Sequence, residues 1–301
     1  MTIGDWILIF LVVVCLAVSG FLFYSQISAK TIEYKQFVSN VTVNMTNSSI
    51  QFYPNMRFSS SDLTYSLDSG CNENRKKSAI DAMKLLESEI PVTFTLGTEN
   101  PEIIIECSSE EPEIAEKNHV IAGAAKPNNI INATKFFVIE NSNISLYKDE
   151  SCDRPLVALH EMLHAFGFDH NSNENSIMYP ITSCEEEIDL DIINELKRLY
   201  SYASLPDVVI EKVVANSSGR YINFEIEIGN QGLIDAKNVQ LDIVSSGESA
   251  KVYELEDIEV GRKKILSVQN IKVKDAENVE FRIIMNEGDL NMADNTAKLY
   301  S

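Results

Sequence analysis

HEMLHAFGFDH, residues 160–170, is the most informative stretch of this sequence. On a helix, His160 and His164 project from one face about one turn apart, which lets two imidazoles hold one metal ion. Gly167 suits a left-handed conformation that ends a helix sharply, so the chain can turn and His170 can supply a third ligand. Three protein ligands leave a fourth position open, which is typical of a catalytic rather than a structural zinc site.

Glu161 follows the first histidine and is expected beside the metal rather than on it. A bound zinc ion lowers the pKa of water from ~15.7 toward ~7, and a nearby carboxylate can then take the proton. An HExxH pattern alone also arises by chance on ordinary helices. Three of the four histidines fall in this stretch, however, and SIMYP follows at residues 176–180. These additions argue against coincidence.

The pattern HExxHxxGxxH followed by a methionine-containing turn resembles the metzincin metallopeptidases, and SIMYP is most similar to their matrixin branch. The resemblance implies a zinc-dependent endopeptidase that hydrolyses peptide bonds of proteins or peptides. It also implies the following roles: zinc ligands His160, His164 and His170, general base Glu161, Met-turn residue Met178 beneath the zinc, and Tyr179 and Pro180 in the wall of the S1′ pocket.

The resemblance extends from about residue 57 to residue 202, with some departures. No Pro-Arg-Cys-Gly-type propeptide switch is present, so the means of restraining activity stays open. His119 stands alone, without the further histidines of a matrixin structural zinc site. Asn171 occupies a position where matrixins usually carry a small hydroxyl residue. Calcium is a further candidate cofactor for so acidic a chain, but no loop pattern places it.

Residues 57–203 are predicted to form this zincin domain, of mixed α+β class. Alternating or short apolar runs predict strands at 63–67, 92–96, 103–105 and 136–139. Amphipathic patterns predict helices at 74–88, 155–168 and 188–202. A mixed sheet with an active-site helix and a C-terminal helix is therefore expected. The strand at 136–140 is a hypothetical partner for an extended substrate.

Residues 206–301 are predicted to form a separate all-β sandwich, since apolar alternation and turn residues recur at regular spacing. The strand before GNQG at 229–232, the stretch 236–243 and the terminal ADN at 293–295 resemble immunoglobulin-like CARDB modules. That resemblance implies a surface protein or a glycan as a partner. A plain spacer between membrane and peptidase is the alternative, because fold does not fix function.

Residues 1–29 are predicted to form a membrane anchor. The stretch 6–24 is almost purely apolar and is bounded by Trp6 and Tyr24, so it is long enough for a transmembrane helix with interfacial aromatics. Residues 30–56 are polar and predict a juxtamembrane stalk. A cleaved signal peptide, and hence a secreted protein, is the alternative.

The cysteines outside the apolar run and the Asn-x-Ser/Thr sequons point to an extracellular catalytic domain on a single-pass anchor. Cys71, Cys107, Cys152 and Cys184 lie outside the apolar run, and an even count fits two disulfides in an oxidising compartment. Three connectivities are open; we prefer 71–107 and 152–184, because the second would join the two ends of the active-site segment. A Cys/His metal site is the competing interpretation.

The formal charge of −20 over 301 residues disfavours nucleic acid as a partner, because phosphates would be repelled. Two other functional classes stay open. One is a surface adhesion or binding protein with an inactive zinc site, and the other is a structural surface protein in which the β domain dominates. The presence of Glu161 with all three histidines favours the enzyme.

Overall fold

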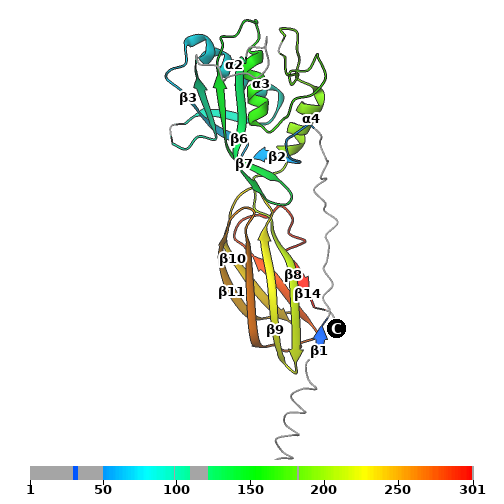
Figure 1. Ribbon diagram of the computed structural model, residues 1–301. Helices are drawn as coiled ribbons and strands as arrows, with labels where there is room; N and C mark the ends of the chain where they lie inside the picture. The colour runs from blue at the N-terminus through cyan, green and yellow to red at the C-terminus, as the bar shows by residue number, and fades with distance from the viewer. Residues whose placement is uncertain (1–29, 33–49, 98, 109–120, 182, 300–301) are drawn as a thin grey trace, which may run out of the picture.

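The structure, a computed structural model, describes residues 30–32, 50–97, 99–108, 121–181 and 183–299. Figure 1 shows two bodies stacked end to end, an upper one that carries the helices and a lower one built of strands. The upper body contains, in chain order, β2 (Met56–Phe58), β3 (Asp62–Leu67), α2 (Glu73–Glu89), β4 (Thr93–Leu96), β5 (Ile103–Cys107), β6 (Gly123–Asn132), β7 (Phe137–Leu146), α3 (Leu156–Ala165) and α4 (Leu190–Leu199).

A single sheet organises the upper body. Its strand order is β2-β7-β5-β3-β4, and β6 pairs with β7. The pairings are parallel except that between β6 and β7, which is antiparallel. The predicted mixed sheet is thus confirmed, and four of its strands lie where apolar alternation placed them. Strands β2 and β6 were not predicted, because β2 is short and β6 carries Asn, Lys and Pro instead of an apolar repeat.

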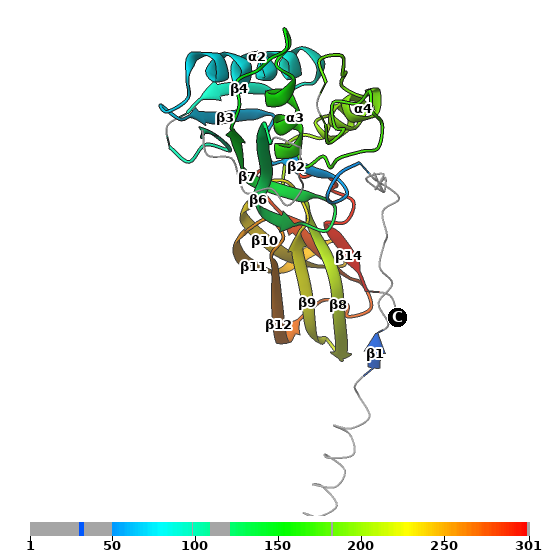
Figure 2. The ribbon, with the colours of Figure 1, turned by 45° about the horizontal axis from the view of Figure 1, so that its top comes forward.

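Helix α2 confirms the helix predicted at 74–88. The side chain of Asn72 accepts a hydrogen bond from the Arg75 N–H at 2.9 Å and so caps the first turn. One face of α2 is buried, with Ala79, Met83 and Leu86 in the domain core. Figure 2 shows α2 lying along β4 and β3, with α3 beside β7. The core therefore fills the space between the sheet and both helices.

Helix α4 is shorter than the predicted 188–202 and is fastened at its C-terminal end by β2. The guanidinium of Arg57 is almost fully buried and donates to the main-chain oxygens of Leu199 at 2.5 Å and Tyr202 at 3.1 Å. Its Cζ also lies 4.4 Å from the ring centroid of Tyr200. The carbonyls that a helix end leaves free are thereby satisfied from another element.

The segment predicted as the end of a stalk packs against the upper body instead. Gln51 forms an antiparallel bridge with Phe168, and its amide exchanges hydrogen bonds with the main chain of Met56 at 2.8 and 3.1 Å. Asn55 and Met56 are fully buried. Polar residues alone suggested an extended linker, whereas their side chains in fact pair with main-chain groups. The folded domain therefore includes residues 50–56.

Strand β7 cannot receive a substrate over residues 137–139, which corrects the hypothesis for the strand at 136–140. Phe137, Val138 and Ile139 pair with β2 and also with Asn132, Ile131 and Ile130 of β6. Both edges of β7 are therefore occupied there. Among the described residues, β6 is paired with β7 only, so the free edge near this point belongs to β6.

The lower body is a two-sheet β structure, as predicted for residues 206–301. Its strands are β8 (Val208–Ser218), β9 (Tyr221–Asn230), β10 (Ala236–Ser245), β11 (Glu248–Ile258), β12 (Lys263–Lys272), β13 (Val279–Ile284) and β14 (Thr296–Lys298). One sheet has the order β1-β8-β9-β12 and the other β11-β10-β13-β14. Alternate residues of β9, including Ile222, Phe224 and Ile226, are buried in the core of this body. The immunoglobulin-like identity itself stays a prediction.

Strand β1 (Lys30–Ile32) joins this second body from the other end of the sequence. It pairs antiparallel with β8, with Lys30 opposite Ser217 and Ile32 opposite Ala215. These residues were predicted to lie in the stalk. An edge strand offers unpaired main-chain groups, and a polar segment can pair with them without any apolar pattern of its own.

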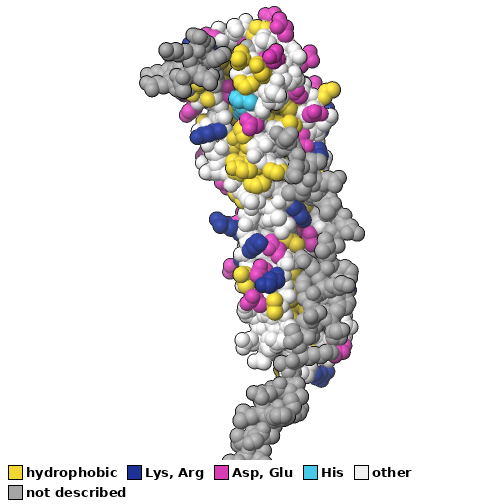
Figure 3. All heavy atoms as spheres, turned by 45° about the vertical axis from the view of Figure 1, so that its right-hand side comes forward, with side chains coloured by type: hydrophobic (Ala, Val, Ile, Leu, Met, Phe, Trp, Pro, Cys, Tyr) yellow, Lys and Arg dark blue, Asp and Glu magenta, His cyan; other side chains and the backbone are white. Residues whose placement is uncertain are grey.

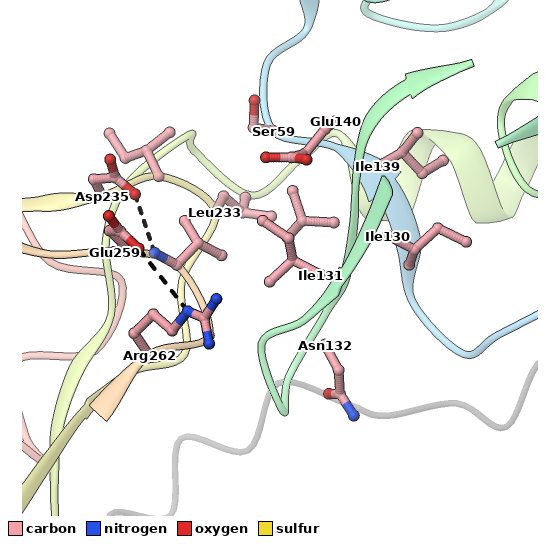
Figure 4. Close-up of a pocket in the computed structure, with 14 residues that line it drawn as sticks. Ser59, Ile130, Ile131, Asn132, Ile139, Glu140, Leu233, Asp235, Glu259 and Arg262 are labelled. Atoms are coloured by element: carbon pink, nitrogen blue, oxygen red, sulfur yellow. Dashed lines mark hydrogen bonds and ion pairs between the residues drawn. The ribbon is translucent and has the colours of Figure 1, made fainter. Parts of the chain in front are cut away.

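The hairpin of β6 and β7 meets the loops of the β body, where a small third core forms. Phe136 is fully buried and packs edge-on against Tyr202 at 5.7 Å between ring centroids, close to Leu233 and Val260 of the β body. A cavity of about 800 Å³ lies beside this contact. Figure 4 shows isoleucines of the hairpin on one side of it and the Asp235, Glu259 and Arg262 side chains on the other.

The predicted anchor at residues 6–24 lies outside the described residues. Within the part of the chain that the structure describes, no helix is both long and apolar enough to span a bilayer.

Candidate metal centre

Helix α3 carries the first two histidines and is positioned by burial on nearly all of its faces. Leu156, Leu159 and Leu163 belong to the domain core. Pro155 occupies the N-cap position and offers no side-chain cap. The carboxylate of Glu150 caps the helix in place of a residue at the N-cap position, because it accepts a hydrogen bond from the Val157 N–H at 2.9 Å. This capping role of Glu150 could not be predicted from the sequence, because the carboxylate comes from outside the helix.

The helix ends at the glycine that the motif predicts. Gly167 has φ +90°, a left-handed conformation, and a Cβ there would lie 2.5 Å from the Sδ of Met56. The N–H of Phe168 donates to the oxygen of Leu163 at 3.1 Å, which closes the last turn. The chain then reverses and brings His170 back over the helix.

The three imidazoles converge on one point. The Nε2 atom of His170 lies 3.2 Å from Nε2 of His160 and 3.1 Å from Nε2 of His164. Two imidazole nitrogens of a tetrahedral zinc site lie about 3.3 Å apart when each Zn–N bond is about 2.0–2.1 Å. The spacing of the three nitrogen atoms therefore fits one zinc ion, as the sequence predicted.

The opposite ring nitrogens fix the orientation of two of these rings. Nδ1 of His160 donates to the main-chain oxygen of Ile177 at 2.5 Å, and Nδ1 of His164 donates to that of Phe168 at 2.7 Å. A proton held on Nδ1 leaves the Nε2 lone pair free for a metal. Neither acceptor carbonyl could be identified from the motif, because it specifies side chains rather than main-chain partners.

The electrostatic environment favours neutral imidazoles. The pKa of His160 is lowered to about 4, mainly by burial and in addition by the neighbouring His164. Burial also lowers the pKa of His164, against a hydrogen bond to Phe168 that raises it. A neutral imidazole is the form that binds a metal ion, so no proton has to be displaced from these two rings near neutral pH.

Glu161 points into the same site without being one of its three donors. It is buried, and its Oε2 has no hydrogen-bond partner among the described residues. Burial raises the pKa of its carboxyl to about 8. A buried carboxylate oxygen without a donor is costly unless a cation or a water molecule compensates it. This orphaned oxygen beside three converging imidazoles fits a site that holds a zinc ion.

Gly123 on β6 makes room for that carboxylate. A Cβ at this position would lie 2.6 Å from Cγ and 2.7 Å from Oε1 of Glu161. Only a glycine therefore lets the strand pass so close to the helix. Gly123 could not be predicted as part of the site, because no sequence signal links it to a residue 38 positions later.

The turn at 176–180 lies under the site. Met178 is fully buried in the same core as α3, and its main-chain oxygen accepts from the Asn171 N–H at 2.9 Å. The Ser176 hydroxyl accepts from the Met178 N–H at 3.0 Å and donates to the Asp189 carboxylate. Asp189 is thus a positioning residue that the sequence did not reveal.

Of the two residues predicted to form the wall of the substrate pocket, only one lines the cavity. Pro180 lines the cavity at the histidines, whereas Tyr179 is half-buried and is not among its lining residues. The cavity measures about 820 Å³ and runs along β6 and the Cys152–Cys184 disulfide. Figure 3 shows histidine at the surface of the upper body, between patches of hydrophobic side chains.

Both preferred disulfides are present, Cys71–Cys107 and Cys152–Cys184. The second joins the segment before α3 to the segment after the Met178 turn. The competing Cys/His metal site is therefore wrong for these four cysteines. His119 lies outside the described residues.

Comparison with known proteins agrees with this geometry. Residues 57–201 match the family model described as Matrixin, Peptidase_M10. No curated protein matches the chain. The fold, the histidine triad and the family match together define a matrixin-like catalytic domain, and they support a zinc metallopeptidase activity acting on proteins or peptides.

Proposed function

We propose that the chain is a zinc-dependent endopeptidase in which Glu161 is the general base. The observation that carries the proposal is the convergence of three Nε2 atoms next to a buried carboxylate oxygen that lacks a donor. His160, His164 and His170 would hold the zinc ion. The ion supplies Lewis acidity, which polarises a substrate carbonyl and makes a water molecule easier to deprotonate.

Glu161 would take the proton from the attacking water and pass it to the leaving amine. Its raised pKa in the metal-free protein shows how strongly burial disfavours an isolated charge there. Since a cation placed beside it would favour the ionised form, Glu161 would act as a base only in the zinc-loaded protein. Because Gly123 has no side chain, it leaves room for this carboxylate beside the histidines.

The substrate would lie along the free edge of β6. This strand begins at Gly123, beside Glu161, and continues to Asn132. Main-chain pairing with an exposed strand edge gives affinity for extended peptides with little dependence on sequence. The stretch from Gly123 to Lys126 begins beside Glu161 and is the part of the strand nearest the histidines. Pro127, which lacks an N–H, cannot donate to a paired substrate.

An extracellular setting is part of the proposal. It is supported by two disulfides, which persist in oxidising compartments, and by the exposure of the sequon asparagines Asn132 and Asn216. Two further parts of the proposal rest on the sequence. One is tethering to a membrane through residues 6–24, and the other is recognition of a surface protein or glycan by a CARDB-like domain at 206–301.

The test is hydrolysis of a quenched fluorescent peptide library by residues 50–301, with zinc content measured in parallel. We expect activity that a chelator removes and added zinc restores. Glu161→Gln should bind zinc as the parent does and lose activity by at least about a hundredfold. The matched control is Glu186→Gln, another buried glutamate whose Oε2 lacks a partner among the described residues. An active Glu161→Gln variant would disprove the assigned base.

A further inference from the structure

Three aspartates meet at the junction of the two bodies, far from the histidines in sequence. Asp207 immediately precedes β8, and Asp289 and Asp294 lie in the loop between β13 and β14. One carboxylate oxygen from each lies within 4.8 Å of the others. Asp207 is completely buried, which is rare for a carboxylate that has no full set of partners.

One cation faces this cluster, and it comes from the other body. Nζ of Lys135, in the turn between β6 and β7, contacts Oδ2 of Asp207 and lies 3.4 Å from Oδ2 of Asp294. Within the described parts of the chain, no other lysine or arginine forms an ion pair with the three carboxylates. Two formal negative charges are therefore left uncompensated, the amount that one divalent cation neutralises.

Several oxygen atoms at this place are buried and lack a donor. Oδ1 of Asp207, Oδ1 of Asp294 and Oδ1 of Asn295 have no hydrogen-bond partner among the described residues. Asn295 is itself only 7% exposed. A buried acceptor without a partner is destabilising, and more so when it is charged. A cluster of such oxygens is stable when a cation occupies the space between them.

The orientation of the third carboxylate is fixed in advance. Asp289 accepts from the Val208 N–H at 2.8 Å through Oδ2 and from the Asn291 N–H at 2.7 Å through Oδ1. The side chain of Asn295 also hydrogen-bonds to this carboxylate. Preorganised donors lower the cost of binding, because little side-chain freedom remains to be lost.

We propose that Asp207, Asp289, Asp294 and Asn295 form a calcium site at the junction of the two bodies. Calcium accepts six to eight oxygen ligands in flexible geometry, whereas magnesium demands a strict octahedron and keeps most of its water. The all-oxygen donor set, the doubly negative cluster and the irregular arrangement of a buried and two partly exposed carboxylates match calcium. Asp289 and Asp294 are partly exposed, so water can complete the coordination.

Binding there would fasten the peptidase-like body to the β body. Lys135 shares Asp207 and Asp294 with the site, and it belongs to the turn that also carries Phe136 of the small junction core. A cation that holds Asp207 and Asp294 in place keeps the partners of Lys135 in place as well. Calcium would therefore stabilise the junction without touching the zinc centre.

The experiment is calorimetric titration of calcium into the calcium-free, zinc-loaded chain, repeated with magnesium, alongside thermal unfolding in both ions. We expect one calcium ion per chain, a higher unfolding midpoint with calcium, and weaker binding of magnesium. Asp294→Asn and Asn295→Ala should each weaken calcium binding at least tenfold. The control Asp257→Asn alters an exposed carboxylate paired with Lys237 and should bind calcium as the parent does.

Two results would overturn the site. One is the absence of calcium binding by a folded, zinc-loaded chain. The other is binding that Asp294→Asn and Asn295→Ala leave unchanged, which would place the ion elsewhere. Because zinc content and peptide hydrolysis are recorded on the same samples, a failed calcium site is distinguishable from a failed peptidase assignment.

Discussion

Nδ1 of His160 donates a hydrogen bond of 2.5 Å to the main-chain oxygen of Ile177, which joins the active-site helix to the turn that contains Met178. The contact crosses 17 positions of sequence and ends on a carbonyl, not on a side chain. It means that the orientation of the first ligand depends on the turn beneath it. The conformation of that turn depends on the hydrogen bonds of the Ser176 hydroxyl with the Met178 N–H and the Asp189 carboxylate.

We therefore expect Asp189 to support zinc binding indirectly, by holding the turn in place, although it does not contact the metal. Asp189→Ala should leave the Ser176 hydroxyl without its acceptor and loosen the turn. We expect zinc affinity to fall about 10- to 100-fold, the range typical of outer-shell partners. Competition with a chromophoric zinc chelator measures the affinity. Rescue by Asp189→Asn, which keeps an acceptor, is expected, and equal loss in both variants would contradict the hydrogen-bond explanation.

Gly123→Ala should impair catalysis more than stability. The added Cβ would meet the Glu161 side chain, which can rotate away, so the cost falls on the position of the carboxylate. We expect activity to drop about a hundredfold, as for a misplacement of about 1 Å, with zinc content unchanged. The control is Gly288→Ala, where a Cβ would make ordinary contact with Leu205 at 3.5 Å. Full activity of Gly123→Ala would show that this space is not needed.

The two disulfides offer a matched comparison. Their sequence separations are 36 and 32 residues, so loop-closure entropy predicts about 4 kcal/mol of stabilisation for each. Replacing both cysteines of either pair by serine should therefore lower the free energy of unfolding similarly. Only the Cys152/Cys184 double variant should also weaken zinc binding, since that pair flanks the metal centre. Chemical unfolding and zinc titration of both variants give the answer, and equal zinc affinities would count against local positioning.

Phe136→Ala should uncouple the two bodies. Phe136 is fully buried between Tyr202 and the loops of the β body, and removing so large a side chain costs about 3–5 kcal/mol. We expect the thermal unfolding curve to divide into two transitions and the 203–206 link to become sensitive to protease. Val214→Ala, at an exposed position of β8, is the control. A single unchanged transition would show that the junction core does not couple them.

Asp294 predicts a pH dependence of stability in calcium-free buffer. Its pKa is raised to about 6, mainly by burial; Lys135 lowers the pKa, and Asp207 and Asp289 contribute to raising it. The unfolded chain has a pKa near 3.9, so the folded state binds the proton more tightly. The contribution of this group to the free energy of unfolding is therefore fully present below about pH 4 and is lost as the pH rises to about 6.

Asp294→Asn removes this titration. In urea unfolding at a series of pH values, the difference between parent and variant should change between pH 4 and 6 and be constant above that window. The difference isolates Asp294 from other carboxylates that titrate in the same range. A difference that does not vary with pH would contradict the raised pKa.

The sequence by itself determined the histidine triad that fits a zinc ion. Helical spacing places His160 and His164 on one face, and Gly167 allows the reversal that returns His170, so local geometry is enough to assemble the triad. Alternation of apolar residues likewise placed most strands of both bodies, because burial of one face leaves a period in the sequence. Segments without that period, including β1, β2 and β6, were missed.

The tertiary structure alone decided everything that depends on main-chain partners or on residues far apart in sequence. The acceptors of the His160 and His164 rings are carbonyls, the space for Glu161 is the missing side chain of Gly123, and the buried Asp207 meets Lys135 from the other body. None of these leaves a periodic or compositional signal, because the partners are selected by packing of the folded chain and not by their neighbours in sequence.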